Sequence, residues 1–202
     1  MSHSPITSTS TAAPERPAPS RGEAPILLEL VDEHGATTGV AEKLSVHREP
    51  GTLHRAFSVF LLDGQGRLLL QRRARGKYHS PGVLTNTCCG HPYPRERPLD
   101  AALRRVGEEL GAVPALLREA GTVCYRHPDP VSGLVEHEFN HLFAGRLEQP
   151  TDPDPDEVEE ILAVGPAELE GLRATEPFSV WFGTVWEAVR PQIRDLAPGA
   201  GW

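Results

Sequence analysis

The side chains best suited to chemistry gather around Cys88 and Cys89, within the segment Thr85–Pro92 of this 202-residue chain. Cys89 stands two residues before His91. A thiol can act as an acid or, once deprotonated, as a nucleophile. Free cysteines are also common packing residues, so this segment alone leaves a catalytic role and a structural role open for Cys89.

A second pattern of charged residues runs between two glycines: Gly90, Glu96, Arg104, Glu108, Glu109 and Gly111. Its spacing resembles the Nudix box, whose glutamates hold a metal ion against a diphosphate. The glutamate expected directly after Arg104 is replaced by Arg105. Arginine cannot bind a metal ion, but its planar guanidinium matches phosphate oxygens. We therefore expect a diphosphate-binding Nudix fold whose chemistry is not hydrolysis.

A pair of carboxylates, Glu136 and Glu138, flanks His137 in a segment that predicts a strand. Side chains alternate along a strand, so both carboxylates point to one face, about 7 Å apart, and His137 points to the other. Such a pair is repulsive unless a cation lies between the two groups. A solvated polar face is the alternative that the spacing leaves open.

The same segment matches the H-E-x-x-H pattern of zinc metalloproteases through His137, Glu138 and His141. That motif requires a helix, because its histidines must be neighbours four positions apart. On a strand they would be about 13 Å apart. Alternating apolar and histidine positions over residues 135–143 favour the strand, so we expect no protease site.

A basic run, Arg72, Arg73, Arg75 and Lys77, follows a predicted strand. It is either the solvated end of that strand or a phosphate clamp facing Arg105.

Hydrophobic periodicity predicts the elements that position these residues. Strands are expected over residues 26–31, 56–62, 67–71, 135–147 and 158–164, and helices over 98–110, 166–172 and 179–193. The buried face of the first helix is predicted to be Leu99, Ala102, Leu103, Val106 and Leu110, with Gly111 as its end. Strands mixed with a few helices indicate an α/β (α+β) fold, with one domain built on a mixed β-sheet flanked by helices.

Composition limits the remaining possibilities. A net charge of −8 and a pI near 5.6 argue against non-specific binding of nucleic acid or anionic membranes. No apolar run reaches the ~18 residues of a membrane helix, and three cysteines suit a reducing cytoplasm. We expect a disordered tail over residues 1–25, a domain over 26–195 and a C-terminal tail over 196–202.

Together these segments resemble type I isopentenyl-diphosphate delta-isomerase over about residues 26–189. The segments that carry the resemblance are Thr85–Pro92, Arg104–Gly111 and Glu136–Phe143, supported by residues 42–43, 53–57 and 177–181. The resemblance implies the interconversion of isopentenyl and dimethylallyl diphosphate in isoprenoid biosynthesis. Cys89 and Glu138 would act as acid and base on opposite faces of the allylic unit. Tyr125 would hydrogen-bond within the site, and the face of Trp181 would stabilise a carbocation-like intermediate.

The resemblance also implies the metal ions and the phosphate contacts. One divalent ion, Mn²⁺, Zn²⁺ or Mg²⁺, would bind to a set of histidines and glutamates: His47, His54, His91, Glu136 and Glu138. Glu109 would help to hold a Mg²⁺ ion on the substrate diphosphate. Basic side chains would neutralise that diphosphate: Arg73, Lys77 and Arg105. The expected partner is this small prenyl diphosphate, and the expected state is a monomer.

Two positions depart from the family pattern. Leu84 stands where a tryptophan is usual, and Ser80 where an aromatic residue is common. Both changes are expected to widen the pocket near the hydrocarbon. Two other functions stay open: a Nudix pyrophosphohydrolase of a nucleoside diphosphate derivative, and a non-catalytic Nudix domain that binds metal.

Overall fold

The structure is a computed structural model that describes residues 25–77 and 79–202. The expected N-terminal tail therefore lies, up to residue 24, outside the described residues. Among the described residues, no helix is both long enough and apolar enough to cross a membrane.

Within the described residues, nine strands form one sheet: β1 (Leu27–Val31), β2 (Thr37–Glu42), β3 (His54–Leu62), β4 (Leu68–Arg73), β5 (Leu84–Thr85), β6 (Cys88–Gly90), β7 (Leu116–Pro128), β8 (Val135–Arg146) and β9 (Val158–Val164). The helices are α1 (Lys43–His47), α2 (Pro98–Leu110), α3 (Pro166–Thr175) and α4 (Phe182–Leu196). The strands and helices expected from periodicity are present, with ends that differ by a few residues.

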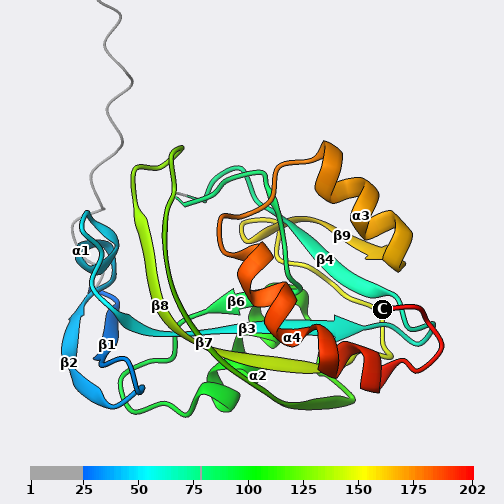
Figure 1. Cartoon of the computed structure of the whole chain (residues 1–202), viewed down its shortest axis with the longest axis horizontal. Helices are drawn as coiled ribbons and strands as arrows, with labels where there is room; N and C mark the ends of the chain where they lie inside the picture. The colour runs from blue at the N-terminus through cyan, green and yellow to red at the C-terminus, as the bar shows by residue number, and fades with distance from the viewer. Residues whose placement is uncertain (1–24, 78) are drawn as a thin grey trace, which may run out of the picture.

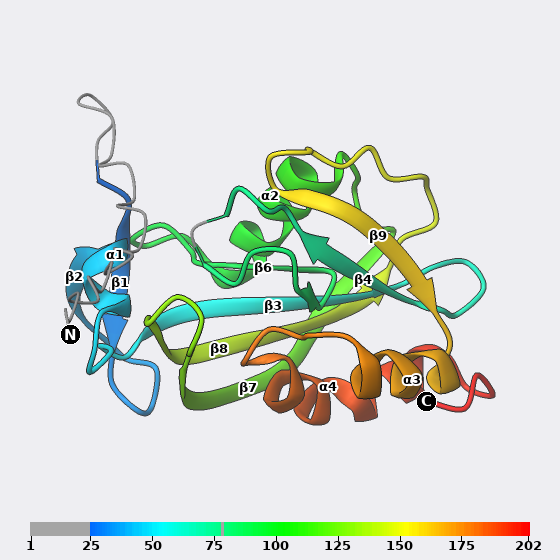
Figure 2. The same cartoon turned by 90° about the horizontal axis from the view of Figure 1, so that it is seen from above.

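The sheet is mixed, because β3 pairs in parallel with β8 and antiparallel with β4 and β6. Strand β7 pairs antiparallel with β8, and β9 pairs antiparallel with β4. Helices α2 and α4 lie on opposite sides of the sheet (Figure 2). The expected α+β architecture with one mixed sheet is confirmed (Figure 1).

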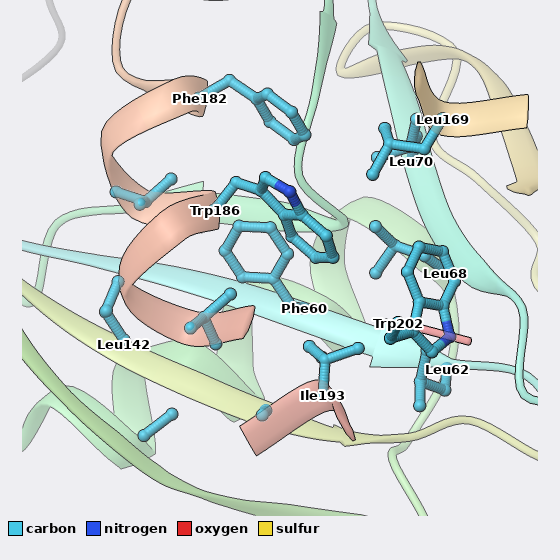
Figure 3. Close-up of a cluster of buried hydrophobic side chains, with 14 of the residues drawn as sticks. Phe60, Leu62, Leu68, Leu70, Leu142, Leu169, Phe182, Trp186, Ile193 and Trp202 are labelled. Carbon is cyan, nitrogen blue, oxygen red and sulfur yellow. The ribbon is translucent and has the colours of Figure 1, made fainter. Parts of the chain in front are cut away.

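Strand β3 is buried on both faces, and its side chains are shared between two apolar cores, one on each side of the sheet. Phe60 contributes to the core beneath α4, where it packs near Trp186 with ring centroids 6.0 Å apart (Figure 3). Phe57 and Val59 contribute to the core beneath α2. Because period-2 alternation sends neighbouring side chains to opposite faces, a strand buried on both sides is apolar at nearly every position. His54, the first residue of this strand, belongs to the candidate site described below.

Helix α2 differs in one respect from the expected buried face. Leu103 is 39% exposed, whereas Ala101 is completely buried. A small side chain lets the helix approach the sheet closely, so Ala101 and Ala102 occupy the contact. Gly111 ends the helix in the left-handed conformation, with φ 60°, as expected.

The structure also differs from the expected C-terminal tail. Trp202 is 7% exposed and belongs to the core beneath α4. Its Nε1–H donates to the carbonyl of Gly66 at 2.9 Å, and its ring packs against Trp186. Within residues 196–202, the side chains of Leu196, Ala197 and Trp202 therefore belong to the core, where Trp202 buries a large apolar ring.

Candidate active site

A cavity of about 450 Å³ opens beside the sheet and has two chemically distinct regions. One region is lined by histidines and glutamates that include His47, His91 and Glu138. The other region is lined by the basic side chains Lys77 and Arg105, among others. The cavity is thus suited to a ligand with one anionic end.

The five predicted metal ligands come together in the first region. The ligand atoms of His47, His54, His91, Glu136 and Glu138 all lie within 4.8 Å of one another. Their positions follow from the strand register, because His54 at the start of β3 pairs directly with Glu138 on β8. Within the cluster, the Nε2 atoms of His54 and His91 lie 3.1 Å apart, and His91 Nε2 lies 3.3 Å from Glu138 Oε1.

The hydrogen bonds of two histidines fit a metal ion. The Nδ1 atoms of His47 and His54 lie 2.7 Å and 2.8 Å from the carbonyls of Lys43 and Thr52. A carbonyl only accepts, so each Nδ1 carries a proton, and in the neutral ring the lone pair of Nε2 is available to an ion in the cluster.

Electrostatics point to the same conclusion. Burial lowers the pKa of His54 to about 4, so its imidazole is neutral at pH 7. Burial, together with the nearby charge of Glu138, raises the pKa of Glu136 to about 8. Two buried carboxyl groups repel each other when both are charged, and a divalent cation between them would supply the compensating positive charge.

His137 lies on the opposite face of β8 from this cluster, as alternation predicted. Its Nδ1 lies 3.0 Å from the carbonyl oxygen of Gly51. His141 is likewise engaged elsewhere, since its Nε2 lies 2.9 Å from Arg55 Nη1. Because residues 135–146 form a strand, the metalloprotease pattern has no structural basis.

Glu138 also belongs to a hydrogen-bonded group with Tyr125 and Asn140. Tyr125 on β7 pairs with Glu138 in the sheet, and its hydroxyl donates to Glu138 Oε2. Asn140 Nδ2 donates to the same oxygen at 2.9 Å and to the Tyr125 hydroxyl oxygen at 3.1 Å. Burial raises the pKa of Tyr125 well above its usual range, so the hydroxyl stays protonated. Sequence reasoning missed Asn140, although it follows Glu138 by two residues and so shares its face of the strand.

The adjacent cysteines point to opposite sides of the sheet. Cys88 is completely buried in the core beneath α2, whereas Cys89 lines the cavity. Arg73 Nη1 lies 3.8 Å from Cys89 Sγ. Burial raises the pKa of Cys89 to about 11, so its thiol carries a proton at pH 7.

Trp181 lines the same cavity and borders Arg73. The guanidinium carbon of Arg73 lies 5.5 Å from the centre of the indole ring. Trp181 Nε1–H donates to Asn86 Oδ1 at 3.3 Å, which fixes the ring. An aromatic face in this position can stabilise positive charge in a ligand.

Acidic partners surround the basic residues of the second region. Arg105 contacts buried Glu109 directly and donates to Glu108 Oε2 at 2.8 Å. Glu157 Oε2 contacts Lys77 and lies 3.2 Å from Arg105 Nη2. The structure thus brings Lys77, Arg105 and Glu109 together.

Arg73 is more deeply buried than a side chain that only binds phosphate would be. Its Nε and Nη2 groups donate to the carbonyls of Ser80 and His79 at 3.0 and 2.9 Å. Arg72 and Arg75 face away, pairing with Glu160 and Glu159.

The two departures from the family pattern lie behind the wall of the cavity. Leu84 is fully buried in β5, and Ser80 Oγ donates to Asp129 Oδ2 at 3.2 Å. Neither residue is among the described residues that line the cavity, whereas His79 is. The expected widening of the pocket by Leu84 and Ser80 therefore has no support in this geometry.

Comparisons with known proteins agree with this fold. Residues 52–182 match the NUDIX domain family. A protein from Deinococcus radiodurans has a crystal structure similar to this one, with a TM-score of 0.65 and 20% identity over 81% of this chain and 98% of that chain. The chain therefore belongs to the NUDIX domain family.

Curated relatives define the family more narrowly. An isopentenyl-diphosphate Delta-isomerase of Streptomyces griseus is 66% identical over 178 residues, which cover 88% of this chain and 90% of the relative. A protein of the same name from Streptomyces coelicolor is 61% identical over 95% of this chain and 98% of the relative. Within the NUDIX domain proteins, the chain belongs to the isopentenyl-diphosphate Delta-isomerase family.

Proposed function

We propose that this protein interconverts isopentenyl diphosphate and dimethylallyl diphosphate. The observation that carries the proposal is that Cys89 and Glu138 line the same cavity, and that basic side chains line another region of that cavity. The names of the relatives from Streptomyces agree with this reaction. The diphosphate would occupy the basic region, and the five-carbon chain would extend towards the two proton-transferring groups.

The hydrogen bonds favour one assignment of acid and base. The Cys89 thiol is protonated at pH 7 because burial raises its pKa to about 11, so it suits proton donation. Glu138 Oε2 accepts hydrogen bonds from Tyr125 and Asn140. Against the effect of burial, the contacts with His91 and His54 hold the pKa of Glu138 well below its usual range, so Glu138 is ionised and suits proton removal. A cavity that excludes water would protect the cationic intermediate, which the face of Trp181 would stabilise.

We further propose that His47, His54, His91, Glu136 and Glu138 hold a divalent ion. Mixed nitrogen and oxygen ligands suit Mn²⁺, Zn²⁺ or Mg²⁺. The ion would keep the two buried carboxylates in their charged form. Glu109 would help to hold a Mg²⁺ ion on the diphosphate, and Arg73, Lys77 and Arg105 would offset the remaining negative charge.

The cellular setting is part of the same proposal. Cys88, Cys89 and Cys124 are free thiols, which suits a reducing cytoplasm. The partner we propose is the small prenyl diphosphate, bound by a monomer and without nucleic acid or membrane.

A pyrophosphohydrolase is the alternative, and the identity of residue 105 argues against it. Arg105 stands where the Nudix box has a further metal-holding glutamate, and a guanidinium cannot bind a metal ion. The diphosphate would therefore be retained while the hydrocarbon reacts.

One experiment separates these functions. The protein is incubated with isopentenyl diphosphate and Mg²⁺ in D₂O, and both products and released phosphate are measured. We expect deuterium in dimethylallyl diphosphate and no phosphate release. Phosphate release without deuterated product would instead identify a hydrolase.

A further inference from the structure

His79 approaches the proposed metal site from a loop between β4 and β5, and no residue pattern in the sequence marks it. Its side chain is 9% exposed, and its Nε2 atom lies 2.6 Å from Glu136 Oε1. The other oxygen of that carboxylate, Oε2, lies 3.5 Å from His47 Nε2. The Glu136 carboxylate thus lies between an imidazole of the His/Glu cluster and an imidazole outside it.

The main chain around His79 is held from two directions. Buried Arg73 donates to the carbonyl oxygens of His79 and Ser80, at 2.9 and 3.0 Å. Ser80 has a φ of 44°, a conformation that is uncommon for a residue other than glycine. Ser80 Oγ donates to Asp129 Oδ2 at 3.2 Å, which ties the loop to the end of the β7–β8 hairpin. These contacts fix the backbone from which the imidazole projects.

The His79 imidazole is also fixed by its surroundings. Its Nε2 lies 3.7 Å from Asp129 Oδ2, and its ring centroid lies 5.6 Å from that of Trp181. The ring is therefore packed between the aromatic wall of the cavity and the Glu136 carboxylate. A side chain held in this way can orient its neighbour.

We propose that His79 is a positioning residue of the His/Glu metal site. Its Nε2 contacts Glu136 Oε1 at 2.6 Å and so keeps Oε2 turned towards His47 and the cluster. A carboxylate can otherwise rotate about its last bond, and a fixed neighbour removes that freedom before the ion binds. Partners of this kind typically change metal affinity by roughly 10–100-fold when they are removed. This inference rests on the metal site of the proposed function.

Three variants test the proposal through Mn²⁺ binding alone, measured by electron paramagnetic resonance without substrate. His79→Leu removes the contact with Glu136, whereas His79→Gln keeps a polar nitrogen close to the position of Nε2. His137→Leu is the matched control, because His137 also neighbours Glu136 but lies on the opposite face of β8, bonded to Gly51. Thermal unfolding of each metal-free variant checks that it is folded.

We expect His79→Leu to weaken Mn²⁺ binding by roughly 10–100-fold, with His79→Gln recovering most of the loss and His137→Leu unchanged. In the isomerase assay, His79→Leu should lower kcat and leave KM nearly unchanged, because the basic residues bind the diphosphate.

Parental Mn²⁺ affinity in folded His79→Leu would overturn the proposal. The proposal would also be overturned if His79→Gln lost as much Mn²⁺ affinity as His79→Leu and if a nitrogen signal disappeared from the resonance spectrum of the bound Mn²⁺. His79 would then be a direct ligand of the ion. Absence of Mn²⁺ binding by the parent would reject the metal site together with this inference. The deuterium experiment judges the isomerase activity separately.

Discussion

Replacing Arg105 with glutamate would place a fourth carboxylate among three that Arg105 now contacts. Arg105 lies 2.8 Å from Glu108 and 3.2 Å from Glu157, and it contacts Glu109 directly. The Glu109 side chain is 2% exposed, so the variant leaves a buried charge without its partner. Removing one partner of a buried ion pair costs about 3–5 kcal/mol.

This loss translates into a measurable change in melting temperature. For a chain of about 200 residues, 1 kcal/mol shifts Tm by roughly 2–4 °C, so Arg105→Glu should lower Tm by roughly 6–20 °C. Mg²⁺ should restore part of this loss, because the variant regains the acidic cluster of a Nudix box and binding stabilises the folded state. Arg105→Lys is the control that keeps the positive charge and loses the planar fork.

The assay is thermal unfolding with and without Mg²⁺, followed by measurements of inorganic diphosphate binding and phosphate release. Diphosphate binding should fall, because an attractive charge becomes a repulsive one. We expect no efficient hydrolysis, because the substitution builds no group that activates water. A Tm within about 2 °C of the parent, a shift below the range expected from these ion pairs, would refute the reasoning. Normal diphosphate binding would show that Arg105 does not face the substrate.

Three further predictions concern the thiols, the metal and the N-terminal residues. Cys89→Ser should lower kcat by roughly 10²–10⁴-fold, the usual contribution of a general acid. Cys88→Ser should change mainly Tm, because Cys88 is buried in the core beneath α2. Equal losses of kcat in the two variants would mean that the active thiol is misassigned. Removing metal with a chelator should abolish isomerisation and lower Tm, and full turnover in a metal-free sample would contradict the His/Glu site. Deleting residues 1–20 should leave kcat and KM unchanged, since their composition resembles that of a disordered segment; a large fall in kcat would show that these residues contribute to the site.

Where side chains follow a simple period, the sequence was sufficient to predict the structure. Alternation along residues 135–146 placed Glu136 and Glu138 on one face of β8 and His137 on the other. The turn at residues 63–66 and the end of α2 at Gly111 were also predictable, because their residue types favour those conformations.

Other features depend on contacts between distant parts of the chain. Most positions of β7 are exposed or only partly buried, so this strand has no apolar alternation to reveal it. His79 enters the site through a loop whose shape depends on Arg73 and Asp129. A lone histidine carries no spacing signal, so its role could be inferred only from the folded structure.

Glu157 has a consequence for how the site responds to ionic strength. One of its carboxylate oxygens already contacts Lys77 and Arg105, so these two cations are screened before any ligand arrives. An incoming diphosphate must take the place of the Glu157 carboxylate beside these two cations. Its binding therefore releases fewer salt ions than it would if Lys77 and Arg105 were paired only with ions from the solution. Affinity should therefore fall less steeply with added salt than the number of basic side chains in the cavity suggests. A carboxylate that is covalently part of the chain acts here as a permanent counterion, whose local concentration does not change with the buffer.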